Sequence, residues 1–179
     1  MIICRKLLAK FIAGDEEGII EEAMNIDKLK ALTKTEIMAA SKNLNADEIR
    51  FLIQTLNEKD DTLRYNAFLL LQANSRLFPF VYEFWSYLEA KLESTNSYQR
   101  SLGAMLIAEN VKWDKTDQFD KSFNNYISCC NDEKFITARQ TVQGLEVILK
   151  ATDRYDEKIK QNLTSLSLSQ YKENQQKLL

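Results

Sequence analysis

Histidine is absent from this 179-residue chain, and glycine and proline are scarce, at four residues and one residue. Without histidine the chain can form no Ser-His-Asp or Cys-His catalytic set and no His-ligated metal or haem site. Glycine and proline together make up about 12% of an average protein. Their shortage argues against turn-rich sandwiches, barrels and glycine-dependent phosphate loops. It favours long helices with short connections.

Cysteine occurs only three times, as Cys4, Cys129 and Cys130. An odd number with two adjacent residues is neither a disulfide framework nor a CxxC metal pair. Adjacent residues of a helix point about 100° apart, so we expect Cys129 and Cys130 to be buried structural thiols rather than shared metal ligands. The cysteine content predicts a reducing, cytoplasmic location, and the sequence predicts no metal site and no cofactor.

Long apolar runs are also missing. Arg5, Lys6 and Lys10 interrupt the apolar N-terminus, which leaves no uninterrupted core for a secretory signal. No stretch approaches the ~18 apolar residues of a membrane-spanning helix, so we expect no membrane partner. We expect instead a first helix whose buried face consists of Ile3, Leu7, Leu8 and Phe11.

The charges nearly balance, with 24 basic and 26 acidic side chains, a net charge of −2 and a sequence pI near 5.4. Dedicated nucleic-acid binders usually carry a clear basic excess, so this balance makes nucleic acid an unlikely partner. The acidic cluster within residues 15–22 lacks the loop spacing of a hard-metal site, and we interpret it as a solvated face. The 45% apolar content is sufficient for a sizeable core.

Apolar residues recur at helical spacing along almost the whole chain. Short polar joints separate the helices, and at one of them, 57–61, Asp61 is the expected N-cap. The predicted helices span 46–57, 62–73, 79–92, 98–111, 117–130, 135–151 and 155–166. The tail 170–179 is expected to form a capping helix or a frayed end.

Three of these helices share a repeated pattern. Arg64, Arg100 and Arg139 follow one another at intervals of 36 and 39 residues, each after a polar turn. A small or modest apolar residue stands three positions after each arginine, and leucine stands six positions after it, at Leu70, Leu106 and Leu145. Helix pairs with such a period stack side by side, because one pair alone cannot bury both of its apolar faces.

The pattern resembles HEAT-like repeats of the armadillo type over residues 46–171, and 98–145 more narrowly resembles a group of small bacterial HEAT-like proteins. Some of that group are labelled SufBD-like, a label we discount because proteins of that name form β-helices. The resemblance implies an all-α, right-handed superhelix of stacked antiparallel helix pairs. In one domain, 1–179, residues 1–45 would form a degenerate repeat or cap, 46–151 three helix pairs and 152–179 a C-terminal cap.

In such stacks the second helix of each pair lines a concave surface where partners bind. Here the second helices (60–76, 96–113 and 134–151) carry seven basic and four acidic residues, against three and seven in the first helices. The arginines have two interpretations, a structural pairing with the neighbouring turn or a contact with a ligand. Trp85 is expected in the core and Trp113 partly exposed. The candidate partner-binding residues are Arg64, Arg100, Trp113, Arg139, Gln140 and Gln143.

Because no catalytic constellation is present, the sequence favours a non-enzymatic adaptor that binds a protein or peptide, as a monomer or a weak homodimer. The alternative is a nucleic-acid-binding protein or enzyme, since bacterial alkylpurine DNA glycosylases also use a HEAT-like stack. Such an enzyme needs a catalytic carboxylate and aromatic residues near the lesion. Asp114 beside Trp113 is the one local pair that suggests this.

Overall fold

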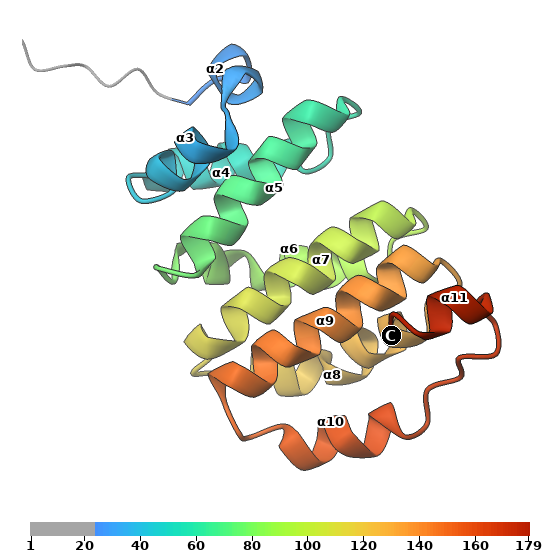
Figure 1. Cartoon of the computed structure of the whole chain (residues 1–179). Coiled ribbons are helices and arrows are strands. Elements are labelled where there is room, and N and C mark those ends of the chain that lie inside the picture. Colours follow the sequence, from blue (N-terminus) through green and yellow to red (C-terminus); the bar gives the residue numbers. More distant parts are fainter. Residues whose placement is uncertain (1–23) are drawn as a thin grey trace, which may run out of the picture.

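The computed structural model describes residues 24–179, and within them the chain forms helices and no strand (Figure 1). The α-helices are α2 (Ile26–Ala31), α3 (Lys34–Ala40), α4 (Ala46–Thr55), α5 (Asp61–Ser75), α6 (Trp85–Leu92), α7 (Ser97–Asn110), α8 (Gln118–Ser128), α9 (Phe135–Ala151), α10 (Asp156–Leu163) and α11 (Glu173–Gln176). The 3-10 helices are η1 (Phe80–Phe84), η2 (Val111–Trp113) and η3 (Cys129–Asn131). The predicted all-α class is confirmed. The first helix and the acidic cluster, predicted within residues 1–23, lie outside the described part.

The helix boundaries follow the sequence signals closely, with three corrections. The helix predicted over 117–130 ends as an α-helix at Ser128 and continues as the 3-10 helix η3. The helix predicted over 79–92 is divided into η1 and α6, because the amide of Tyr82 bonds to the carbonyl of Pro79 three residues back, at 3.1 Å. The N-cap of α5 is Asp60, not Asp61. The Asp60 carboxylate accepts the amide of Leu63 at 3.0 Å, while Asp61 is already helical. A cap of this kind stabilises a helix by about 1 kcal/mol.

The helices form two layers. In one layer α5 packs on α7 and α7 packs on α9; in the other, α4 packs on η1 and α6 packs on α8. The layers are joined where α4 contacts α5 and α6 contacts α7, and where Tyr126 of α8 donates a hydrogen bond to the carbonyl of Thr141 in α9, at 3.2 Å. Figure 1 shows α5, α7 and α9 side by side in the order of the chain.

The core lies between the two layers. The repeated leucines, Leu70, Leu106 and Leu145, are at most 1% exposed, which explains their spacing. Trp85 is buried as expected, and its indole N–H donates to Ser122 at 2.9 Å. Burying one leucine side chain contributes about 2 kcal/mol to the free energy of unfolding. An aromatic cluster continues the core toward α10; its members are Phe119, Phe123, Tyr126 and Tyr155.

Candidate binding surface

The outward faces of α5, α7 and α9 enclose a hollow of about 140 Å³. Its lining comes from all three helices: Gln72, Arg76, Met105, Ala108, Glu109, Gln140, Gln143, Gly144 and Val147. A second hollow of about 260 Å³ lies between α3 and α5, and its lining includes Met38, Tyr65 and Leu69. Gln72 and Arg76 line both hollows, so the two adjoin. We call the surface formed by the linings of these two hollows the second-helix face.

Helical spacing produces this face. On α5, Tyr65, Leu69, Gln72 and Arg76 follow one another at steps of four, three and four residues, which keeps them on one side of the helix. On α9 the same spacing aligns Gln140, Gln143 and Val147. Met38 and Tyr65 are 51% and 45% exposed, which is unusual for large apolar side chains. The face is therefore a row of amide and apolar groups open to solvent.

Arg76 and Glu109, two of the three charged residues that line the hollows, pair with each other, whereas Lys34 forms no ion pair among the described residues. Nε and Nη2 of Arg76 donate to Oε1 of Glu109 at 3.0 and 2.8 Å, and the Glu109 side chain is only 7% exposed. Lys150, one turn beyond Val147, pairs with Glu146 at 2.6 Å. The basic excess counted from the sequence is therefore partly neutralised.

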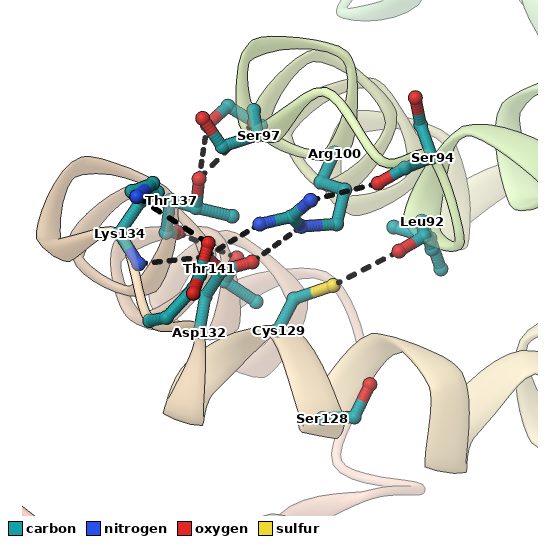
Figure 2. A network of polar contacts seen from close by, with 12 residues as sticks. Leu92, Ser94, Ser97, Arg100, Ser128, Cys129, Asp132, Lys134, Thr137 and Thr141 are labelled. Atoms are coloured by element: carbon teal, nitrogen blue, oxygen red, sulfur yellow. Dashed lines mark hydrogen bonds and ion pairs between the residues drawn. The ribbon is translucent and has the colours of Figure 1, made fainter.

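Arg100 has a structural role. From α7 its guanidinium donates to Asp132 in the turn before α9, with Nη2 2.8 Å from Oδ1, and to the carbonyl of Ser94 at 2.7 Å (Figure 2). The Arg100 and Asp132 side chains are 14% and 4% exposed. The Asp132 carboxylate also accepts the amide of Lys134 at 2.8 Å. This ion pair therefore ties one helix pair to the next.

Arg64 repeats part of this geometry. It donates to the carbonyl of Glu58, six residues upstream, as Arg100 does to Ser94, and it pairs with Asp61. Its guanidinium also lies 4.2 Å above the ring of Tyr98 in α7. Both Arg64 and the third arginine, Arg139, have a buried Nε without a hydrogen-bond partner among the described residues. For Arg64 and Arg100 the geometry matches the structural interpretation.

Trp113 is partly buried at the other end of α7, about 20 Å from Arg100 by helix length. Its indole N–H donates to the carbonyl of Ser75 in α5 at 2.8 Å. Lys112 lies 5.0 Å above its ring and donates to the carbonyl of Arg76 at 2.7 Å. Trp113 therefore joins the ends of two neighbouring helices.

The six predicted residues thus do not form one patch. Gln140 and Gln143 line the hollow, Arg64, Arg100 and Arg139 lie near the N-terminal ends of their helices, and Trp113 lies beyond a C-terminal end. The sequence analysis missed Met38, Tyr65, Gln72, Met105 and Val147. Apart from Gln72 these side chains are largely apolar, and apolar residues at helical spacing suggest core positions rather than surface ones.

Asp114 is the candidate catalytic carboxylate of the glycosylase alternative, and both of its oxygens accept hydrogen bonds from other groups of the chain. Its two oxygens accept the amides of Gln118 and Phe119 in the first turn of α8, at 3.1 and 2.8 Å, and the hydroxyl of Tyr82 at 2.8 Å. Burial alone would raise the pKa of Asp114, but these hydrogen bonds hold it below its ordinary value. The side chain acts as a cap for α8.

The adjacent cysteines are both buried, as expected, and both are free thiols. Burial raises the pKa of Cys129 to about 11 and that of Cys130 to about 12, so both are protonated at neutral pH. No group of three or more Cys, Asp or Glu side chains is gathered for a metal ion within residues 24–179. Over the same residues no helix has both the length and the apolarity needed to span a membrane.

Lys91 is an unusual buried cation that the sequence analysis did not single out. It is 6% exposed, and its ammonium donates to the side-chain oxygens of Asn57 (3.0 Å) and Gln99 and lies 4.7 Å from the ring of Tyr87. No carboxylate forms an ion pair with it among the described residues. Burial lowers the pKa of Lys91 to about 8.

This lowered pKa gives a test by pH. The folded protein loses the Lys91 proton near pH 8, while the unfolded chain holds it to about 10.5, so alkali favours folding over that range. Relative to a Lys91→Met variant, the wild type should gain on the order of 2 kcal/mol of unfolding free energy between pH 7 and pH 10. Denaturant unfolding at several pH values measures this. Lys121→Met, at an exposed lysine, is the control: it keeps Lys91 and should therefore show the same gain between pH 7 and pH 10 as the wild type.

Comparison with protein-family models, curated proteins and solved structures finds no match to this chain.

Proposed function

We propose that this chain is a HEAT-like stack of helix pairs whose second-helix face binds a segment of another protein, without catalysing a reaction. The observation that carries this proposal is the pair of adjoining hollows, built from α3, α5, α7 and α9 and lined mainly by apolar and amide side chains, of which Met38, Tyr65 and Gln143 are exposed. Exposed apolar groups gathered on one surface commonly mark interaction sites.

The repeated architecture supports the stack. Most side-chain hydrogen bonds between successive helix pairs join residues 32 to 40 positions apart, a range that includes the spacings of the arginines. Asn74 donates to the carbonyl of Ser41 at 2.8 Å, and Asn110, 36 residues later, donates to Oγ of Ser75 at 2.9 Å. Ser101 and Thr137 bond at 3.1 Å across a separation of 36 residues. Equivalent positions thus meet equivalent neighbours, as stacking of similar units requires.

The lining indicates the kind of segment. Amides such as Gln72, Gln140 and Gln143 each offer a donor and an acceptor, which suits the backbone of a bound peptide. Met105 and Val147 contribute apolar contact, and methionine adapts to varied shapes. Because the Arg76–Glu109 pair neutralises its own charges, we expect a largely apolar segment, with Lys34 as the one charged lining residue left to meet an acidic group.

Selection from a random peptide library tests this proposal without a known partner. Peptides selected on the wild type should lose at least tenfold in affinity for Gln143→Arg, which places a long cation in the hollow. Asn124→Arg is the matched control, because Asn124 is an exposed amide on α8 in the other layer, and this variant should bind as the wild type does. Equal weakening by both variants, or by neither, would contradict the assignment of the face.

The glycosylase form of the nucleic-acid alternative is less favoured, because its candidate carboxylate, Asp114, already caps α8. A DNA retardation assay at low salt separates the two proposals, since phosphate contacts are strongest there. DNA retained at low salt and released by salt would favour the alternative.

A further inference from the structure

The hollow between α3 and α5 differs from the adjoining one in its charged groups. Its charged lining residues, Lys34 and Arg76, are both basic, whereas the lining of the adjoining hollow also includes the carboxylate of Glu109. The rest of its lining is apolar apart from one phenol and one amide: Ile37, Met38, Tyr65, Leu69, Gln72 and Ala73. Apolar walls beside basic groups fit a ligand that has an apolar part next to an anionic one.

The Arg76–Glu109 pair presents its cation to solvent. The Arg76 side chain is 52% exposed, while that of Glu109 is 7% exposed. Nε and Nη2 of Arg76 both donate to Oε1 of Glu109, and Nη1 has no hydrogen-bond partner among the described residues. The pair is neutral as a whole, but a ligand at the surface meets the guanidinium before the carboxylate. Because Coulomb energy falls with distance, the pair still attracts an anion on this side.

Lys34 and Tyr65 supply two further donors to the same hollow. Both side chains are exposed, and within residues 24–179 neither the Lys34 ammonium nor the Tyr65 hydroxyl has a hydrogen-bond or ion-pair partner. Carboxylates close to them in sequence already have partners: Glu36 bonds to Thr33, Asp60 pairs with Lys30, and Asp61 pairs with Arg64. The hollow therefore offers donors to an anionic group and, in its described lining, no carboxylate to repel one.

We propose that the segment bound by the second-helix face contains an acidic side chain next to a large apolar one, and that these two side chains occupy the hollow between α3 and α5. The apolar side chain packs against Met38 and Leu69, and the carboxylate accepts hydrogen bonds from Lys34 and Tyr65. This inference rests on the proposed function, because it names part of the segment bound there. It also gives the segment a direction, with its acidic part over α3 and its remainder extending toward α9.

Charge reversal at Lys34 tests the assignment in the full chain. Peptides are selected while their C-termini are fused to a carrier and are then synthesised with amidated C-termini, so any carboxylate comes from a side chain. Those selected on the wild type should share an Asp or Glu beside a large apolar residue. They should lose about tenfold in affinity for Lys34→Glu, because an attraction becomes a repulsion. Replacing the acidic peptide residue by lysine should restore affinity for this variant.

The variant and its control are matched in charge. Lys34 is the first residue of α3, where an acidic side chain is favourable, so Lys34→Glu should fold. Lys121→Glu makes the same change in net charge at an exposed lysine on α8 in the other layer, and it should bind the peptides as the wild type does.

Two results would overturn this inference and leave the proposed function standing. In the first, the peptides lose affinity for Gln143→Arg but bind Lys34→Glu and Lys121→Glu equally well or share no acidic residue. In the second, the lysine-substituted peptide does not regain affinity for Lys34→Glu, so Lys34 does not contact the acidic residue. Peptides that bind all three variants as they bind the wild type, or a selection that yields no peptide, would contradict the proposed function as well.

Discussion

Replacing Arg100 by alanine is expected to lower the free energy of unfolding by about 3 kcal/mol, because it leaves the Asp132 carboxylate buried without its cation. The loss should be large because Asp132 is only 4% exposed at its side chain and lies between two helix pairs. Denaturant unfolding followed by circular dichroism measures the change.

Arg50→Ala is the matched control, since the Arg50–Asp47 pair is 57% and 92% exposed at its side chains and should contribute less than about 0.5 kcal/mol. An Arg100→Met/Asp132→Leu double variant should recover most of the stability, because neither charge is then left alone. A loss for Arg100→Ala as small as that for Arg50→Ala would show that the pair does not tie the helix pairs together.

Gly144→Ala should also destabilise the protein, by about 2 kcal/mol, although alanine is the better helix former by about 1 kcal/mol. A Cβ at this position of α9 would overlap the hydroxyl oxygen of Tyr126 and lie 3.2 Å from Cβ of Ala108. Tyr126 is fully buried and cannot move aside without disturbing the aromatic cluster. Thermal or denaturant unfolding of the variant measures the loss.

A second substitution identifies the cause. Tyr126→Phe removes the overlapping oxygen, so the Gly144→Ala/Tyr126→Phe variant should be more stable than Gly144→Ala alone, despite losing the hydrogen bond to Thr141. Gln143→Ala, at the exposed neighbouring position, should change stability by less than about 0.5 kcal/mol. If the double variant were no more stable than Gly144→Ala, steric overlap with Tyr126 would not be the reason.

Local sequence patterns predicted most of the helices. The helix over 135–151 matches α9 residue for residue, and the leucine six positions after each arginine is buried in all three helices. The division of 79–92 into a 3-10 helix and an α-helix could not be predicted from the sequence. The five residues of η1 are too few for periodicity to distinguish a 3-10 turn from an α-helix. The N-cap of α5 was predicted one residue too late, because Asp60 and Asp61 are chemically equivalent candidates.

The surface was harder to predict than the core. Arg100 and Asp132 are 32 residues apart, and only the alignment of neighbouring helix pairs brings them together. Gln140 and Gln143 were named because they lie on the predicted second helix 134–151, next to Arg139 of the repeated pattern. Met38 and Tyr65 were not, because nothing local distinguishes an exposed apolar residue from a buried one.

The most direct test of the central claim is an isotope-edited spectrum of the full chain titrated with the tightest peptide from the library selection. We expect amide shifts to change along α5, α7 and α9 around Gln72, Met105 and Gln143, and to stay constant along α6 and α8. Shifts confined to α6 and α8, or to the surface around α4, would contradict the proposal that the second-helix face binds the partner.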